Sequence, residues 1–284
     1  MTEEQPSYLD LTLPLKVLSY AILLIGAFVM VLPFIWMVTT ACKSPQELVT
    51  LPVRWIPDNP VCLENFQALY EQSPNFNRYL LNSAIVTIGR TVGQLVMCSL
   101  AAYGFARFRF PGRNVIFALC LGLLMVPFQA IIIPEFILIK DLGWLNKFQA
   151  LLVPGIFSAF ALFLLRQAFL QIPLELEESA FIDGANPLQV LWHITLPLSV
   201  PAITAFAVIT VQAAWNDFLY PLIVANTPDT RVITIGISLL QGERSTPFNI
   251  LMMGSFIATV PMLILFVLLQ RYFIEGVSMT GIKQ

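Results

Sequence analysis

The stretch EESAFIDGANPLQVLWHITLPL, residues 177–198, differs sharply from the oily segments on both sides of it. It opens on two acids, turns at an Asp-Gly-Ala-Asn-Pro sequence and enters the next apolar block through Leu-Pro. A small, polar-edged turn therefore interrupts a chain that is otherwise mostly apolar.

Helix start and stop residues predict two short helices here. Pro173 suits a first helical turn, and residues 174–183 contain no breaker. Gly184 ends this helix, because glycine readily adopts the positive φ found just past a helix end. Asn186 offers a cap and Pro187 a first-turn residue for a second helix. We expect the two helices to lie at an angle on the membrane surface.

In the second helix Leu188, Leu191, Trp192 and Thr195 recur at i, i+3, i+4 and i+7, which predicts one shared face. The corner before it is built from small residues that let another backbone approach: Ser179, Ala180, Gly184 and Ala185. Acids at the corner offer charge to a partner: Glu177, Glu178 and Asp183. Two interpretations remain open, a docking knob for another protein and an interfacial connector whose acids are merely solvated.

Composition places the whole chain in a membrane. Of its 284 residues 57% are hydrophobic and 11% are charged, with a mean hydropathy of +0.79. Soluble domains carry about 25% charged residues. The net charge is −2 and no basic block occurs, so nucleic acid is not an expected partner.

Cysteine and histidine usage argues against metal and redox chemistry. The four cysteines have no Cys-x-x-Cys spacing, and a single histidine, His193, is present. Cys42 and Cys62 are predicted to fall on the same outer side and would be able to pair. We favour the alternative, in which all four cysteines are unpaired packing residues.

Windows nearly free of charge predict six transmembrane helices. They are residues 17–41, 79–106, 114–134, 148–165, 198–225 and 250–272. The first window is about 25 residues long, too long for the apolar region of a cleaved signal. The predicted layout is a tail at 1–16, a transmembrane domain at 17–272 and a tail at 273–284.

The loop RFRFPGRN, residues 107–114, sets the orientation, because it carries three arginines and no acid. The positive-inside rule predicts that it is cytoplasmic. Both termini and the loop at about 166–197 are then cytoplasmic too. The segments 42–78, 135–147 and 226–249 are expected outside, and none is long enough to hold an enzyme domain.

The opening stretch resembles the EAA motif of permease subunits of bacterial ABC importers. The matching positions are Glu178, Ser179, Ala180, Gly184, Ile194, Leu196 and Pro197. Ser179 replaces the usual second residue, alanine, and this small-for-small change is expected to leave docking intact. Asp183 and Ala185 also match the family's Asp-Gly-Ala.

The resemblance runs along nearly the whole chain. It includes AAYGFARFRFPGRN at 101–114, WNDFLYPLI at 215–223 and GVSMTGIKQ at 276–284. These stretches look like the second six-span permease of maltose- and glycerol-3-phosphate-type importers. The resemblance implies the type I importer fold and a place in a bacterial inner membrane.

The partners implied by the resemblance are a second permease, two cytoplasmic ATPase subunits and an outer sugar-binding protein, besides membrane lipid. The EAA corner would be the coupling helix seated in an ATPase cleft. The tail at 276–284 would reach into the ATPase dimer interface. The chain has no Gly-x-x-x-x-Gly-Lys-Ser/Thr loop. We therefore expect no catalytic residue, metal or cofactor here, with ATP and Mg²⁺ acting on the partner.

Two other classes of function stand against this interpretation. A self-sufficient secondary transporter or channel would show inverted repeats and acidic relays within its spans. An intramembrane enzyme would need a paired nucleophile and base there. We see no clear repeat and no such pair.

Two charges fall inside predicted spans, Arg90 and Asp217. Charges at membrane depth are costly and face protein or water. At 1.5 Å per residue they lie about 24 and 28 Å from the cytoplasmic ends of their spans. A role in the substrate pathway, a structural ion pair and misjudged span limits all remain open. Trp215 and Tyr220 flank Asp217 and suit either a sugar-binding vestibule or the outer aromatic belt, and we favour the belt.

Overall fold

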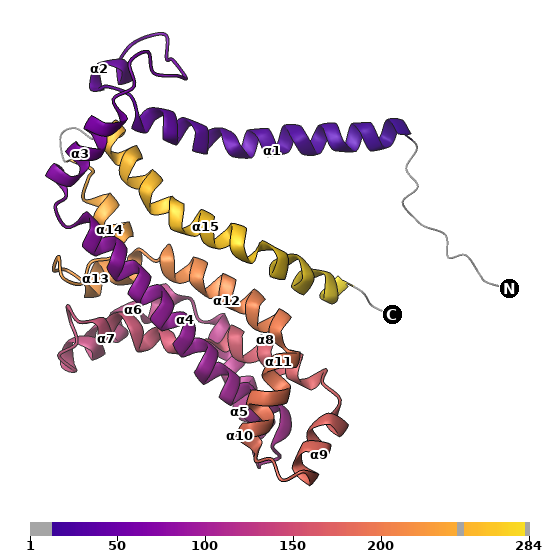
Figure 1. Ribbon diagram of the computed structural model, residues 1–284. Coiled ribbons are helices and arrows are strands. Elements are labelled where there is room, and N and C mark those ends of the chain that lie inside the picture. Colours follow the sequence, from indigo (N-terminus) through magenta and orange to yellow (C-terminus); the bar gives the residue numbers. More distant parts are fainter. Residues whose placement is uncertain (1–12, 243–246, 282–284) are drawn as a thin grey trace. The chain divides into compact units, whose positions relative to one another are not determined.

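The computed structural model describes residues 13–242 and 247–281, which divide between two compact units. The first unit holds the chain up to Glu71 together with Gly242–Ile257, and the second holds Gln72–Gln241 and the chain from Ala258. Within the described ranges the only regular secondary structure is helical (Figure 1). The all-α prediction is confirmed. The predicted tails lie partly outside these ranges.

The first unit is built around two helix ends. Its elements are α1 (Leu13–Ala41), α2 (Pro45–Leu48), α3 (Cys62–Gln72) and the start of α15 (Phe248–Gly281). A capping box starts α2, where Ser44 and Glu47 each bond the other's backbone amide. The Glu47 carboxylate also accepts from the amides of Asp58 and Asn59, at 2.9 and 3.2 Å. The segment after α1 is therefore folded back on itself.

A disulfide joins Cys42 to Cys62 in this unit. Our preference for unpaired cysteines at these two positions was wrong. The buried amide of Asn65 donates to the carbonyls of Ala41 and Lys43, at 2.8 and 2.9 Å, and so ties the start of α3 to the end of α1. This long-range contact brings the two cysteines together, and no spacing rule in the sequence would reveal it.

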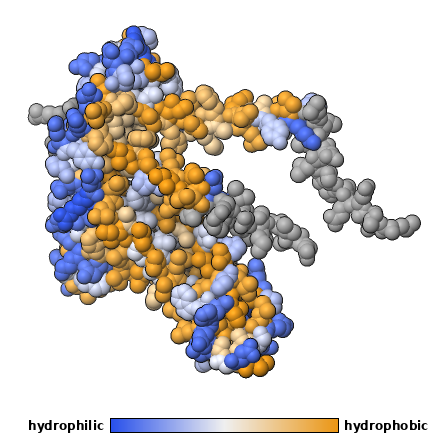
Figure 2. Space-filling model, viewed as in Figure 1, coloured by the Kyte–Doolittle hydropathy of each residue, from blue (hydrophilic) through white to orange (hydrophobic). Residues whose placement is uncertain are grey.

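The second unit is centred on the long helix α4 (Phe76–Arg107). The first elements after α4 are α5 (Arg113–Gly122), η1 (Leu123–Met125), α6 (Phe128–Asp141), α7 (Phe148–Leu152), η2 (Pro154–Ile156) and α8 (Ala159–Leu170). The elements that follow are α9 (Leu174–Ile182), α10 (Pro187–Val190), η3 (Leu191–Thr195), α11 (Leu196–Leu198), α12 (Val200–Trp215), α13 (Leu219–Val224) and α14 (Ile233–Ser238). Hydrophilic residues gather around α7 and around α9, with a largely hydrophobic surface between them (Figure 2).

Among the described residues, three helices are long and apolar enough to cross a membrane. They are 14–41, 76–107 and 248–268. Three further helix pairs pass the same test together but are bent, by 102° within 113–141, by 41° within 148–170 and by 82° within 187–215. Counting each pair as one span gives the six predicted.

The bends lie where the backbone cannot continue a helix. Val126 is extended, with φ −87° and ψ 114°, and the following Pro127 has no amide proton to donate. Phe157 and Ser158, both extended, form the second break, and Ser199 stands between Pro197 and Pro201 at the third. The charge-free windows therefore located these segments but not their breaks.

Two glycines let the broken α7–η2 segment approach α4 closely. A Cβ added at Gly89 would lie 2.7 Å from Leu152 Cδ2, and one at Gly93 would lie 2.8 Å from Ile156 Cγ2. The spacing Gly-x-x-x-Gly is the usual pattern for close helix packing in membranes. Gly89 and Gly93 therefore indicate a close helix contact at this point of α4, which our sequence analysis did not predict.

Candidate functional site

The stretch 177–198 forms the predicted corner. Helix α9 ends at Ile182, and Gly184 follows with a φ of +89°. The amide of Ala185 donates back to Ala180 O at 2.9 Å, which closes the turn. Asn186 then caps α10 through a reciprocal capping box with Gln189. The local signals thus specified the corner correctly.

The corner presents small and polar residues at its surface. Glu178, Ser179, Asp183 and Gly184 are exposed, while Ala180 and Ala185 are partly buried. A shallow hollow of about 350 Å³ lies beside them. Its lining consists of Ala180, Asp183, Gly184, Ala185, Gln189, Val190, His193 and Ile194. Of the remaining motif positions, Leu196 is partly buried and Pro197 is exposed.

Glu177 does not belong to this surface, contrary to our prediction that the first acids offer charge to a partner. Its side chain is 3% exposed and accepts from Arg107 Nε at 2.9 Å. Tyr103 on α4 and Thr195 on η3 also donate to its carboxylate, at 3.3 and 3.2 Å. Arg107 donates in addition to Ile172 O. One buried carboxylate therefore ties α9 to both α4 and η3.

The predicted single face of the second helix is also wrong. Leu191 and Thr195 are buried, whereas Leu188 and Trp192 are 58% and 57% exposed. Residues Leu191–Thr195 form a π-helical turn, which widens the helix and shifts the angular position of side chains. Exposed apolar groups of this size at the polar end of a unit are typical of a surface that another protein covers.

The two intramembrane charges meet. Arg90 Nη1 lies 2.8 Å from Asp217 Oδ2, and each side chain is 20% exposed. Arg90 comes from the middle of α4, and Asp217 lies in the link between α12 and α13. The Nε atom of Arg90 is buried and has no hydrogen-bond partner in the structure. The pair is therefore formed but not fully satisfied.

Arg90 passes directly over Gly155 in η2, just before the break in the 148–170 segment. A Cβ added at Gly155 would collide with the guanidinium of Arg90. Gln94, one turn along α4, donates to Gly155 O at 2.5 Å and accepts from Thr210 at 3.1 Å. Gly155 in η2 thus leaves room for an arginine and offers its carbonyl to Gln94.

A further acid, Glu135, lies near this ion pair, although we predicted that residues 135–147 form an outer segment. Glu135 lies in α6, close to Tyr220, Arg90 and Asp217. The segment bends by 102° near Pro127, and α6 then continues past Pro134, where the charge-free window ended. Glu135 therefore lies within the helix and not in an outer loop. Two carboxylates therefore share the surroundings of one guanidinium.

The two flanking aromatics are buried, which contradicts our preferred aromatic-belt interpretation. Trp215 is 8% exposed and donates from Nε1 to Ala258 O at 3.2 Å. Tyr220 is 5% exposed and donates to Ala150 O at 2.9 Å. Belt residues keep their polar ends at the membrane–water interface, whereas these two fix one segment to another inside the second unit.

The fold defines the class of protein. A bacterial ABC transporter that imports the acidic polysaccharide alginate contains a chain of the same fold, with a TM-score of 0.83. The match covers 95% of this chain and 100% of that one, at 21% sequence identity. The prediction of an ABC importer permease fold is confirmed.

Sequence similarity gives the family. The model of the binding-protein-dependent transport system inner membrane component matches residues 94–278, and the chain belongs to this family. It is 34% identical over 260 residues to the lactose transport system permease protein LacG of Rhizobium radiobacter, covering 92% of this chain and 94% of LacG. It is 34% identical over 276 residues to the trehalose/maltose transport system permease protein MalG of Thermococcus litoralis, covering 94% and 98%.

Proposed function

We propose that this chain is the permease subunit of an ATP-driven carbohydrate importer, and that ATPase motion enters it at the corner 177–198. The observation that carries the proposal is a tight corner, with the spacing of the EAA motif, at which Ser179 and Gly184 are exposed and Ala180 and Ala185 are partly buried. Full-length similarity to permeases named for lactose and for trehalose/maltose transport supports a sugar as the substrate class.

The motif residues take distinct roles in this proposal. Glu178 and Asp183 offer charge to the ATPase cleft, and the small side chains of the corner allow its backbone to approach. Gly184 provides the turn. Ile194, Leu196 and Pro197 connect the corner to α12. The partner supplies ATP and Mg²⁺ chemistry, since the chain has no phosphate-binding loop.

The path of the motion follows from the bonds of Glu177. Because its carboxylate binds groups on α4 and η3, a displacement of α9 carries both elements with it. Helix α4 bears Arg90 roughly four to five turns away, at 3.6 residues per turn. Arg107, which binds the corner through Glu177, and Arg90 of the intramembrane pair therefore lie on one helix, α4.

We further propose that Arg90 and Asp217, with Glu135 beside them, border the substrate pathway. The support is their partial exposure at membrane depth, where a lipid-facing charge would be costly. We retain the cytoplasmic placement of both termini and the role of 276–284 at the ATPase interface as parts of the proposal. The side chains of that tail lie outside the described residues.

The test compares two glycines that share a backbone conformation. Gly184 and Gly143 both have positive φ, +89° and +65°, and a Cβ on either would meet nothing within 4 Å. Aspartate tolerates the left-handed region better than most residues, so Gly184→Asp and Gly143→Asp should both fold. Only Gly184 lies in the proposed docking corner.

The chain is co-expressed with the second permease, the ATPase and the binding protein, and uptake of the sugar that the binding protein carries is measured. We expect Gly184→Asp to abolish uptake and to reduce the ATPase that co-purifies, while Gly143→Asp retains both. Normal uptake by Gly184→Asp, or a wild-type chain that brings down no ATPase, would refute the proposal.

A further inference from the structure

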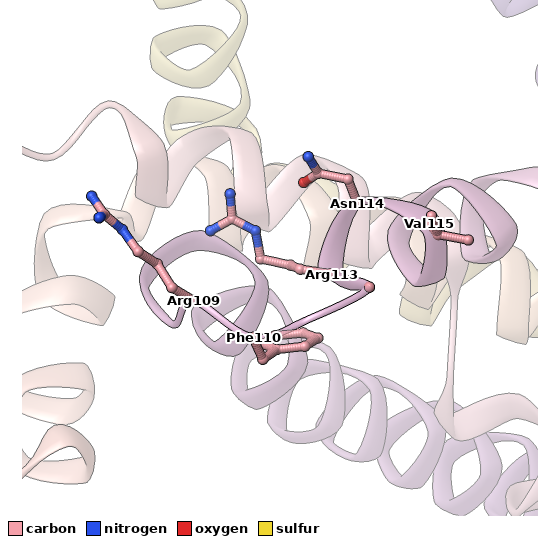
Figure 3. A pocket seen from close by; sticks show the side chains of 6 residues that line it. Arg109, Phe110, Arg113, Asn114 and Val115 are labelled. Carbon is pink, nitrogen blue, oxygen red and sulfur yellow. The ribbon is translucent and has the colours of Figure 1, made fainter.

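The turn between α4 and α5 contains a recess that the proposed transport cycle does not use. Arg109, Phe110, Gly112, Arg113, Asn114 and Val115 line it, and its volume is about 360 Å³. In Figure 3 the side chains of Arg109, Arg113 and Asn114 extend to the same side of the turn, and Phe110 lies on the other side. The recess therefore gathers two guanidinium groups and an amide.

Positive charge in this recess is not neutralised by the described part of the chain. Arg107 in the same loop pairs with Glu177, but neither Arg109 nor Arg113 has a carboxylate within 4.0 Å among the described residues. The guanidinium of Arg113 donates from Nη1 to Phe108 O at 3.2 Å. Arg166 on α8 adds a third positive charge, which interacts electrostatically with that of Arg113.

The backbone reinforces this charge. Helix α5 begins after Gly112, and no side chain caps it. Within the described residues the amides of Asn114 and Val115 have no backbone acceptor, whereas those of Arg113 and Ile116 do. Free amides at a helix start attract anions. Two guanidiniums and two unbonded amides belong to residues that line one recess, and such donors match the oxygens of a phosphate group.

The surroundings of the recess distinguish a lipid from a soluble anion. Phe108 at the turn is 47% exposed. On α5, Val115 and Leu119 are 64% and 69% exposed and lie one turn apart on the same face. Helix α5 belongs to a segment apolar enough to enter a membrane. A phosphate held in the recess would therefore have acyl-sized apolar surface directly beside it.

We propose that this recess binds the phosphate headgroup of an anionic phospholipid, held by Arg109, Arg113 and the start of α5, with an acyl chain along Val115 and Leu119. The lipid would fix the turn to the membrane surface at the end of α4 that carries Arg107. Arg107 in turn binds Glu177 at the start of the corner 177–198.

Native mass spectrometry of the full chain tests the proposal, with phosphatidylglycerol and phosphatidylcholine offered in equal amounts in a neutral, phosphate-free detergent. Each arginine near a charged headgroup contributes about fivefold in affinity, so Arg109→Gln/Arg113→Gln should lower the preference for phosphatidylglycerol about 25-fold. The matched control, Arg54→Gln/Arg78→Gln, removes the same charge from two exposed ion pairs and should keep the preference.

Arg109→Gln alone guards against misfolding, because Arg109 is exposed and makes no ion pair with described residues; it should lower the preference about fivefold. Unchanged preference in both variants overturns the proposal. Displacement of phosphatidylglycerol by an equimolar amount of inorganic phosphate also overturns it, in favour of a soluble anion, because the acyl chain would then contribute nothing to binding. Retained lipid preference with loss of co-purified ATPase overturns it as well, because the arginines would then face a protein.

Discussion

Two ion pairs on α4 look alike in sequence and differ in structure. Arg107 and Glu177, at the cytoplasmic end proposed for the helix, are 8% and 3% exposed. Arg90, in the middle of the same helix, pairs with Asp217, and each of these two side chains is 20% exposed. Both pairs join α4 to a later segment, and their closest N–O distances are 2.9 and 2.8 Å.

The difference lies in how completely each pair is satisfied. The Glu177 carboxylate accepts bonds from Arg107, Tyr103 and Thr195, so its charge is fully used within the chain. Arg90 has one bonded carboxylate, an unbonded Nε and a second acid in its surroundings. A fully satisfied pair serves as an anchor, whereas an under-satisfied pair retains groups that can bind something else.

Breaking the anchor should have the largest effect. Glu177→Ala leaves Arg107 buried without its counter-charge, so we expect the free energy of unfolding to fall by about 3–5 kcal/mol. Denaturant or thermal unfolding of the purified chain measures this. Its neighbour Glu178 is exposed, and Glu178→Ala serves as the control with less than about 0.5 kcal/mol. Equal losses in the two variants would show that Glu177 is not an anchor.

Gly155→Ala should come second, because its new methyl group must displace the guanidinium of Arg90. Overpacking of this kind costs about 1–3 kcal/mol. The control is Gly122→Ala in α5, where a Cβ meets nothing within 4 Å and where alanine favours a helix. If Gly155→Ala acts by breaking the ion pair, its unfolding loss should not add to that of Asp217→Asn. Additive losses would mean that the methyl group acts elsewhere.

Asp217→Asn should cost about 1–2 kcal/mol in unfolding free energy, since one charged hydrogen bond is weakened in a partly exposed site. Combining Asp217→Asn with Arg90→Gln tests whether the pair is only structural or also takes part in transport. The double variant removes both charges of the Arg90–Asp217 pair, so its stability should exceed that of Asp217→Asn alone while sugar uptake stays low. Recovery of uptake in the double variant would reduce the pair to a structural role.

The corner at residues 177–198 could be predicted from the sequence, because local backbone preferences determine it. Pro173, Gly184 and Asn186 act through their own backbone geometry, and each appears where it was expected. The spacing of the motif then identified the family. The π-helical turn was not readable, because Leu191–Thr195 has no residue that demands it. That turn is the reason why the predicted helix face failed.

Long-range contacts were beyond the sequence for a different reason. The Cys42–Cys62 bond depends on Asn65, and the surroundings of Arg90 depend on a turn at Pro127 that redirects Glu135. Hydropathy windows measure whether a segment is apolar, not whether it is straight. Proline alone does not mark the break either, because Pro127 stands at a bend whereas Pro134 and Pro261 lie inside α6 and α15.

The exposed pair of Arg78 and Asp229 sets the lower end of the comparison. Its side chains are 52% and 68% exposed, although the N–O distance is a short 2.7 Å. Water and salt screen such a pair, so Asp229→Asn should change the free energy of unfolding by less than about 0.5 kcal/mol, and by less still at high ionic strength. Unfolding at low and high salt measures this. Burial rather than N–O distance therefore determines how much each of the three pairs contributes to the free energy of unfolding. A loss for Asp229→Asn as large as that for Glu177→Ala, and independent of salt, would contradict this order.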